Sequence, residues 1–191
     1  MKITLIRHAD VEQSYKMRYN GHIDISLSPE GEQQAQRLAE HFKEEKFDAV
    51  FCSDLKRARQ TLAPFGLHVS PTFTESLREK SWGRHEGMSF DEIIESEEFV
   101  YEDFMQWINA LDGEKYELYI QRVEKFFLGF LPKLQKKNIL VVTHAGVIRV
   151  LISIIEKLEL EEAFCIKFDY SSYITLDVNA MKFSEIKNIS L

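Results

Sequence analysis

The feature that most constrains the fold is an unbroken apolar run, residues 138–143 (NILVVT), which leads directly into His144. A strand with one face in water alternates apolar and polar residues, whereas a strand covered on both faces need not alternate. The run therefore predicts a buried strand of a parallel sheet. A polar residue that follows such a strand lies beyond the carboxyl edge of the sheet, where open α/β proteins bind their ligands.

Two more apolar runs lead into polar residues of the same chemical kind. Residues 2–6 run into Arg7 and His8, and residues 47–52 are followed shortly by Arg57. The carboxyl ends of neighbouring parallel strands share one edge of a sheet. We therefore expect these arginines and both histidines to meet at one place.

The segments between these strands have helical spacing or turn residues. Ser28 and Pro29 suit the cap and the first position of a helix. Residues 9–27 have no periodicity and are expected to form a loop. The other expected elements are helices at about 28–42, 55–65, 89–110, 116–134 (kinked near its end by Pro132) and 147–158, a short strand at 67–69, and a closing hairpin of 172–178 and 181–186.

This order of elements predicts an α/β fold with three layers. It has a mostly parallel sheet, helices on both faces, and a helical insert over the C-terminal edge of the sheet. A chain of 191 residues with 45% hydrophobic residues has the size and composition of one globular domain. We expect a single domain over residues 1–191, with the insert at about 89–115. The sequence leaves the oligomeric state open.

The net charge of −7 excludes some classes of partner. A surface that neutralises nucleic-acid phosphates or acidic lipids needs clustered Lys and Arg. We therefore expect no nucleic-acid partner and no membrane partner, and any anion site must be local. The sequence has neither a signal-like start nor an apolar run of ~20 residues, so a cytoplasmic location is expected.

The two cysteines, Cys52 and Cys165, lie in apolar surroundings and show no CxxC or Cys/His metal spacing. We expect both to be buried, reduced thiols. No other pattern of metal ligands is visible in the sequence, so neither a metal nor another cofactor is expected.

Arginine and histidine at one sheet edge suit the chemistry of phosphate monoesters. The planar guanidinium of Arg makes paired, charge-assisted hydrogen bonds to phosphate, and Arg7 and Arg57 together would balance its nearly two negative charges. One His ring can be neutral and nucleophilic while another donates hydrogen bonds. Taken singly, each of these residues is equally consistent with an ordinary loop position.

A longer series of motifs resembles a known family. The series comprises Arg7-His8, residues 18–21 (RYNG), Asp24, Leu27, Gly31, residues 34–35 (QA), residues 53–61 (SDLKRARQT), Glu79, Gly83, residues 86–87 (EG) and residues 142–149 (VTHAGVIR). In this order it is similar to the phosphoglycerate-mutase-like branch of the histidine phosphatase superfamily. The resemblance covers residues 3–149 and implies a metal-independent phosphoric monoester hydrolase.

The resemblance also implies a role for each matching residue. His8 would attack phosphorus and carry the phosphoryl group, while Arg7, Arg57 and His144 would hold the phosphoryl oxygens. Glu79 would protonate the leaving alcohol and then take a proton from the attacking water.

Two of the implied assignments have an alternative. The family pattern favours Glu79 over Glu86 as the acid, whereas spacing alone does not separate them. Arg18 is expected at the substrate site, where it would either touch the substrate or brace its loop.

The residues after His8 depart from the family pattern. Relatives usually have Gly-Glu-Thr or Gly-Glu-Ser there, and often Asn three residues later. This chain has Ala9, Asp10, Val11 and Ser14 instead. Groups that often help to hold phosphate in relatives are thus replaced, which alters the expected wall of the pocket.

We therefore expect a phosphomonoesterase that hydrolyses a small phosphorylated metabolite through a phosphohistidine on His8. Two alternatives stay open, a phosphoglycerate mutase and a catalytically weak module that binds phosphate ligands. Substrate choice is expected to lie in the region 89–110. Its large apolar side chains would either roof the pocket or pack on the helices of the sheet; they are Phe99, Phe104, Met105 and Trp107.

Overall fold

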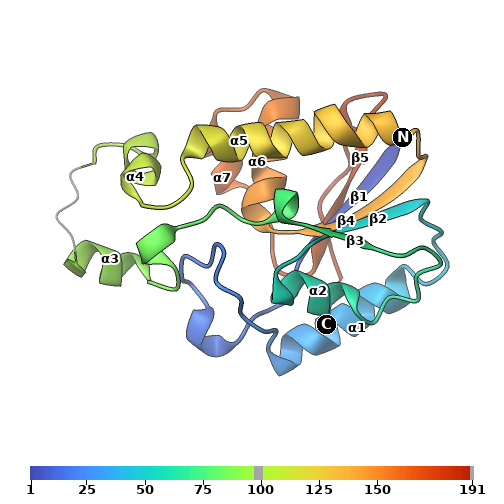
Figure 1. Cartoon of the computed structure of the whole chain (residues 1–191), viewed down its shortest axis with the longest axis horizontal. Coiled ribbons are helices and arrows are strands. Elements are labelled where there is room, and N and C mark those ends of the chain that lie inside the picture. Colours follow the sequence, from blue (N-terminus) through green and yellow to red (C-terminus); the bar gives the residue numbers. More distant parts are fainter. Residues whose placement is uncertain (97–100, 190–191) are drawn as a thin grey trace.

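The computed structural model describes residues 1–96 and 101–189, and its centre is one sheet (Figure 1). The strands lie in the order β3-β2-β4-β1-β5-β6, with β7 paired to β5. Their bounds are β1 Lys2–Arg7, β2 Ala49–Ser53, β3 Thr72–Thr74, β4 Asn138–Thr143, β5 Ser172–Asp177, β6 Lys182–Phe183 and β7 Lys187–Asn188. Strands β3, β2, β4 and β1 run parallel, and β5 pairs antiparallel with β1, β6 and β7. The prediction of a mostly parallel α/β sheet is confirmed.

The central strand β4 is buried on both faces, as its unbroken apolar run predicts. Ile139 and Val141 belong to a core that also includes α5 and α6, whereas Leu140 and Val142 belong to a second core with α1 and α2. Successive side chains of a strand point to opposite faces. Because both faces meet apolar helices, the strand has no polar side.

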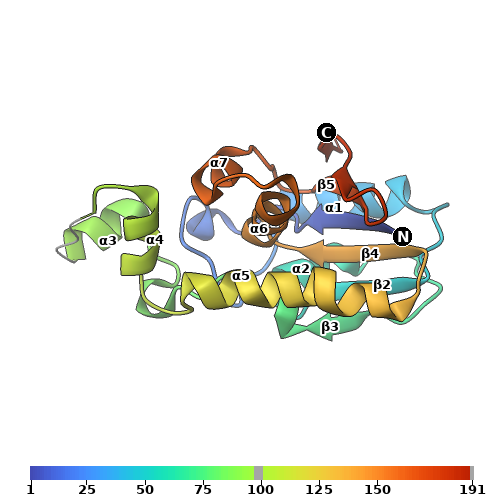
Figure 2. The same cartoon turned by 90° about the horizontal axis from the view of Figure 1, so that it is seen from above.

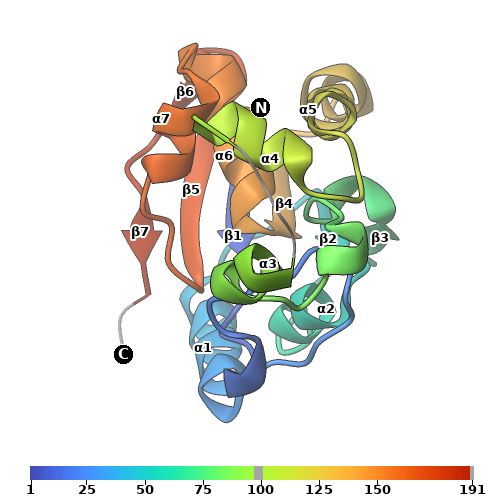
Figure 3. The same cartoon turned by 90° about the vertical axis from the view of Figure 1, so that its left-hand side faces the viewer.

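Helices cover both faces of the sheet (Figures 2 and 3). One face carries α1 (Pro29–His41) and α2 (Lys56–Leu62), and the other carries α5 (Tyr116–Glu124), α6 (Ala145–Glu156) and α7 (Leu160–Cys165). The helices α3 (Phe90–Ser96) and α4 (Phe104–Ala110) lie beyond the carboxyl ends of the parallel strands, at the left of Figure 1. Short 3-10 turns occupy Gln13–Tyr15, Glu75–Leu77 and Gly83–His85.

The start of α1 follows from its capping residue. The Ser28 hydroxyl oxygen accepts a hydrogen bond from the Gly31 amide at 3.0 Å and donates to an Asp10 carboxylate oxygen at 3.1 Å. A capping side chain of this kind satisfies a helix amide that has no partner within the helix. The cap therefore also ties α1 to the loop that follows β1.

The prediction of a strand at residues 67–69 is wrong. The edge strand is β3, which begins just after Pro71 and pairs with residues Phe51–Ser53 of β2. Proline has no N–H to donate to a strand ladder. Regular pairing therefore starts beyond Pro71, and not at the apolar residues before it.

The single long helix expected at 116–134 is also wrong in its second half. The α-helix ends at Glu124, a π-helical turn follows over Lys125–Phe130, and a 3-10 turn containing Pro132 covers Leu131–Leu134. Proline lacks the N–H that an α-helix requires and clashes with the preceding turn.

The helical region expected at 89–110 divides into α3 and α4, and residues 97–100 lie outside the described part of the chain. The helix α7 and the strand β7 were not expected. Both are short elements with weak sequence signals.

Cys52 is buried as expected, but Cys165 is exposed, so the expectation of two buried thiols is wrong. Cys165 is the last residue of α7, in which Ala163 supplies the buried contact. The apolar residues around Cys165 did not indicate which face of so short a helix would be exposed to solvent. Among the described residues, no helix is long and apolar enough to cross a membrane.

Candidate active site

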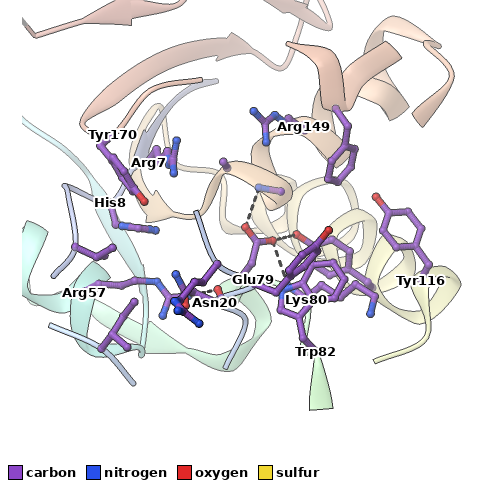
Figure 4. Close-up of a pocket in the computed structure, with 18 residues that line it drawn as sticks. Arg7, His8, Asn20, Arg57, Glu79, Lys80, Trp82, Tyr116, Arg149 and Tyr170 are labelled. Atoms are coloured by element: carbon purple, nitrogen blue, oxygen red, sulfur yellow. Dashed lines mark hydrogen bonds between the residues drawn. The ribbon is translucent and has the colours of Figure 1, made fainter. Parts of the chain in front are cut away.

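The ends of β1 and β4 and the start of α2 meet around one cavity, shown in Figure 4. The rings of His8 and His144 lie edge to face with centroids 5.1 Å apart. The cavity has a volume of about 210 Å³, below the ~300–1,000 Å³ usual for small-molecule sites, so it favours a compact ligand. It is lined by Arg7, His8, Val11, Arg18, Tyr19, Asn20, Ile25, Arg57, Glu79, Lys80, Trp82, Tyr116, Tyr119, Ala145, Gly146, Arg149, Phe164 and Tyr170.

The tautomer of His8 follows from its hydrogen bond. The ring atom Nδ1 lies 2.8 Å from the carbonyl oxygen of Ala9. A carbonyl can only accept, so Nδ1 carries the proton and Nε2 keeps its lone pair. Burial, followed by the nearby charges of Arg57 and Arg7, lowers the pKa of His8 well below its ordinary value. At neutral pH the ring is therefore uncharged, with a free nitrogen.

His144 lies beside His8, but it is fully buried and is not among the residues that line the cavity. A hydroxyl group sets its orientation. Its Nε2 is 2.8 Å from Ser53 Oγ, which itself accepts a hydrogen bond from the Leu55 amide at 3.4 Å. The Ser53 hydroxyl hydrogen can donate to Nε2, and in that tautomer the ring proton lies on Nδ1. That Nδ1 is buried and has no partner in the structure. Burial lowers the pKa of His144 well below its ordinary value, and the neutral ring has one N–H to offer.

Arg57 is buried and Arg7 is half-buried, and neither forms an ion pair with a carboxylate in the described part of the chain. Burial lowers the pKa of Arg57 to about 10, and it lowers that of Arg7 as well. The Nε atoms of both side chains are buried without a partner. Two positive charges with buried, unused donors form a site for a small anion.

Backbone carbonyls hold the rest of the Arg57 guanidinium. It donates to the carbonyl oxygens of Ile23 at 2.9 Å, Gly21 at 2.7 Å and Asn20 at 3.1 Å. The Glu86 carboxylate fixes this loop from the other side, because it accepts from the amides of Gly21 at 2.9 Å and Ile23 at 3.1 Å. Glu86 is absent from the residues that line the cavity. Its carboxylate is occupied in shaping the loop that holds Arg57.

Glu79 points into the cavity and is held from two helices. One carboxylate oxygen accepts from the Tyr119 hydroxyl of α5 at 2.5 Å, and the other accepts from the Gly146 amide of α6 at 2.9 Å. Position 146 requires glycine, since a Cβ there would lie 2.2 Å from Glu79 Oε1 and 2.8 Å from the Tyr119 hydroxyl. The first turn of α6 is thus shaped around this carboxylate.

Arg18 lies at the rim of the cavity and is already paired. Its guanidinium donates to both carboxylate oxygens of Glu92, at 2.5 Å and 3.0 Å, and to the carbonyl of Gly87 at 2.8 Å. These contacts tie the loop after β1 to the start of α3. Of the two roles expected for Arg18, the structure displays the bracing contact.

The four residues that depart from the family pattern occupy different places. Ala9 is buried, and its amide donates to Thr61 Oγ1 at 2.9 Å. The Asp10 carboxylate faces Ser28 and Lys16, away from the lining of the cavity. Val11 supplies an apolar part of the wall, and Ser14 is exposed and does not line the cavity.

Several lining residues were not singled out from the sequence. Tyr119 lies in the helix expected at 116–134, and its contact with Glu79 joins residues 40 positions apart. Burial lowers the pKa of Lys80 to about 8, and its ammonium lies 4.3 Å from the centre of the Trp82 ring. Arg7 stacks on Tyr170, with the guanidinium carbon 3.9 Å from the ring centre. The residues that were not singled out are Tyr119, Lys80, Trp82 and Tyr170; they lie outside the motifs quoted above, so the sequence offered no signal for them.

The described residues of the region 89–110 contact residues that line the cavity but do not line it themselves. Trp107 donates to the Tyr19 hydroxyl at 3.1 Å, and Phe104 packs on Phe164 with ring centres 5.2 Å apart. Met105 is exposed, and Phe99 lies outside the described residues. The aromatic wall itself comes from Tyr19, Trp82, Tyr116 and Phe164.

Across residues 1–96 and 101–189, no group of His, Cys, Asp and Glu side chains is arranged to hold a metal ion.

Comparison with known proteins identifies the family. The family model for the histidine phosphatase superfamily (branch 1) matches residues 3–187. The adenosylcobalamin/alpha-ribazole phosphatase of Escherichia coli is 28% identical over 192 residues, covering 98% of this chain and 94% of that protein. A broad-specificity phosphatase of Saccharomyces cerevisiae is 32% identical over 162 residues, covering 80% of this chain and 69% of that protein.

Solved structures agree with the sequence comparison. The crystal structure of the alpha-ribazole phosphatase from Shigella flexneri matches with a TM-score of 0.81 and 26% identity, covering 96% of this chain and 94% of that one. The chain therefore belongs to branch 1 of the histidine phosphatase superfamily, as its motifs predicted. Within that superfamily it is a phosphatase, a phosphoric monoester hydrolase.

The close approach at Gly146 predicts the effect of adding one methyl group. Gly146→Ala should lower kcat/KM for phosphate-ester hydrolysis at least ~100-fold, because displacing Glu79 and Tyr119 by about 1 Å misplaces a catalytic group. Gly66→Ala is the matched control, since a Cβ at position 66 meets nothing within 4 Å. Steady-state kinetics and thermal unfolding of both variants provide the measurement. Equal activity of the two variants would contradict this account of the Glu79 position.

The environment of His8 predicts its protonation. Since its pKa is lowered, the neutral ring should persist as the pH falls through ~6.5, where an unperturbed histidine gains its proton. Nitrogen-15 NMR of the labelled protein should therefore show a His8 ring with a proton on Nδ1, unprotonated Nε2, and no titration between pH 7.5 and pH 6. A His8 ring that becomes doubly protonated in that interval, or one that carries its single proton on Nε2, would show the assignment to be wrong.

Proposed function

We propose that the chain hydrolyses the monoester of a small phosphorylated metabolite through a phosphohistidine on His8. The observation that carries the proposal is a neutral His8, with Nε2 unprotonated, beside two arginines that lack carboxylate partners. A nucleophile next to unbalanced positive charge suits an electrophile that brings negative charge with it.

In the first step, His8 Nε2 forms a bond to phosphorus as the bond from phosphorus to the ester oxygen breaks. Glu79, in its acid form, gives its proton to that oxygen, so the product leaves as a neutral alcohol. In the second step a water oxygen attacks phosphorus, Glu79 takes a proton from that water, and the bond between phosphorus and Nε2 breaks. Inorganic phosphate leaves, and both residues return to their starting states.

Arg7, Arg57 and His144 act on the phosphoryl oxygens in this scheme. The two unpartnered Nε groups and the His144 Nδ1–H are buried donors that gain partners when a phosphoryl group arrives. Donors fixed in place before the reaction stabilise the charge of the transition state without reorganising. Arg18 braces the rim through Glu92, and we assign it no contact with the phosphoryl group.

The nature of the substrate follows from the size of the cavity and from the relatives. A cavity of about 210 Å³ favours a compact metabolite. The compared proteins are called phosphatases, one of them of broad specificity. No metal or organic cofactor enters the scheme, and we retain the cytoplasm as the proposed location because metabolites of this kind are found there.

Transfer of label tests the proposal directly. Wild-type protein mixed briefly with a substrate carrying labelled phosphate, in excess chelator, should retain acid-labile and alkali-stable label close to one per chain. His8→Ala should retain none, because Nε2 forms the covalent bond. His68→Ala is the matched control, since His68 is exposed and lies outside the cavity.

The same experiment separates hydrolysis from the alternatives. Label that survives in His8→Ala would remove His8 as the carrier. Label recovered on another hydroxyl of the product, and not as inorganic phosphate, would establish a mutase. Binding of phosphate without labelling or turnover would establish a binding module.

A further inference from the structure

Tyr170 lies against the nucleophile, although the proposed reaction gives it no role. Its ring centre is 5.5 Å from that of His8, and the Arg7 guanidinium carbon is 3.9 Å from the Tyr170 ring centre. Figure 4 shows Tyr170 beside both residues, with its hydroxyl oxygen directed into the cavity that the side chain lines. A half-buried tyrosine thus lies where the phosphoryl group would be transferred.

The segment that carries Tyr170 is fixed on both sides of this residue. Before it, the carbonyl oxygen of the buried residue Phe168 accepts a hydrogen bond from Arg7. After it, the Ser171 amide donates to the His8 carbonyl oxygen at 3.3 Å. Because both contacts are made with the end of β1, the Tyr170 ring is held in place relative to the nucleophile.

The backbone next to Tyr170 adopts a conformation that costs free energy. Ser171 has a φ of 61°, in the left-handed region that residues with a side chain rarely adopt. Its hydroxyl donates to the Gln34 side-chain oxygen at 2.8 Å, which fastens the turn to α1. Such strain persists where the surrounding contacts determine it, and it is common near functional groups. The turn presents Tyr170 to the cavity just before β5 begins at Ser172.

The ring and the hydroxyl of Tyr170 have different surroundings. The ring packs on Arg7 and His8, and a phenylalanine ring would pack there equally well. The hydroxyl makes no hydrogen bond within the described part of the chain. Burial has the largest effect on the pKa of Arg7 and of Arg57, and Tyr170 is among the groups that act on each. The hydroxyl is therefore within electrostatic range of both cations that would receive the phosphoryl group.

Tyr170 supplies a neutral donor on a side of the cavity that has few of them. Among residues 9–14, which follow the nucleophile, only Val11 lines the cavity, and its side chain is apolar. Of the four tyrosines in the lining, Tyr170 is the one whose ring contacts His8 in the described part of the chain. A hydroxyl here adds a donor without adding positive charge to a lining that already has five cations. These are Arg7, Arg18, Arg57, Lys80 and Arg149.

We propose that the Tyr170 hydroxyl is a further catalytic group, which donates a hydrogen bond to a phosphoryl oxygen while the phosphoryl group is transferred to and from His8. This inference rests on the proposed function and adds a residue to it. The hydrogen of a hydroxyl rotates about the C–O bond, so the donor can follow an oxygen that moves as phosphorus inverts. The hydrogen bond should be strongest in the transition state, where charge is spread over the three oxygens that stay on phosphorus.

The test is Tyr170→Phe, which removes the hydroxyl and keeps the ring that packs on Arg7. Its kcat/KM for phosphate-ester hydrolysis should be at least ~10-fold lower than that of the wild-type protein, as expected for one hydrogen bond to a charged group. Orthovanadate can bind with the five-coordinate geometry of the transition state, and its inhibition constant should rise at least ~10-fold. The inhibition constant of inorganic phosphate should rise ~3-fold or less, because a ground-state ligand uses the hydrogen bond less fully.

The matched control is Tyr173→Phe, because the Tyr173 hydroxyl is bonded to His41 outside the cavity. This variant should have the kcat/KM and the vanadate inhibition of the wild-type protein. Tyr170→Leu removes the ring as well, so it should be less active than Tyr170→Phe.

The results that contradict the role of the hydroxyl differ from those that contradict the proposed function. Wild-type activity and vanadate inhibition in Tyr170→Phe, with a loss confined to Tyr170→Leu, would show that only the ring matters and would overturn the inference. Equal weakening of phosphate and vanadate would overturn a role in the transition state. In both cases the phosphatase proposal stands. A wild-type protein that hydrolyses no ester and carries no label on His8 would overturn the proposed function and the role of Tyr170 with it.

Discussion

The structure depends on the burial of two guanidinium groups at one edge of a sheet. Moving a cation out of water costs several kcal/mol unless polar groups compensate. Here the compensation comes from the carbonyls around Arg57, from the Phe168 carbonyl on Arg7, and from the Tyr170 ring. Because no described carboxylate neutralises these cations, their charge remains available to a ligand. The same charges and the same burial keep His8 and His144 neutral.

A second set of contacts places the acid opposite this basic group. The segment that carries Glu79 is fixed by α5, where the Arg122 guanidinium donates to the carbonyls of Ser76 at 3.1 Å and Arg78 at 2.9 Å, while Tyr119 holds the carboxylate itself. Gly146 completes the arrangement from α6. The nucleophile therefore belongs to the sheet, whereas the acid is held between two helices. The outer part of the cavity, where the alcohol would lie, is lined by those same helices and by α7.

The features that could be predicted from the sequence are those that a local pattern of residues controls. The run 138–143 became β4 with the expected bounds, and the polar ends of the strands met because parallel topology requires it. The strand at 67–69 failed because an edge strand of three residues has almost no pattern of its own. The partners of Glu79 could not be predicted, since Tyr119 and Gly146 are 40 and 67 residues away and reach it only through the packing of α5 and α6. The hydrogen bonds from backbone amides to Glu86 could not be predicted either, because a backbone amide can donate a hydrogen bond whatever side chain its residue carries.

The claim that the arginine pair is built for a phosphoryl dianion can be measured without any substrate. A ligand that binds only the folded state raises its stability in proportion to its affinity. At constant ionic strength, inorganic phosphate should raise the Tm of the wild-type protein progressively, and Arg57→Gln should respond far less, while Arg59→Gln responds like wild type. Equal phosphate-dependent rises in Tm for Arg57→Gln and wild type, or none in wild type, would contradict the account.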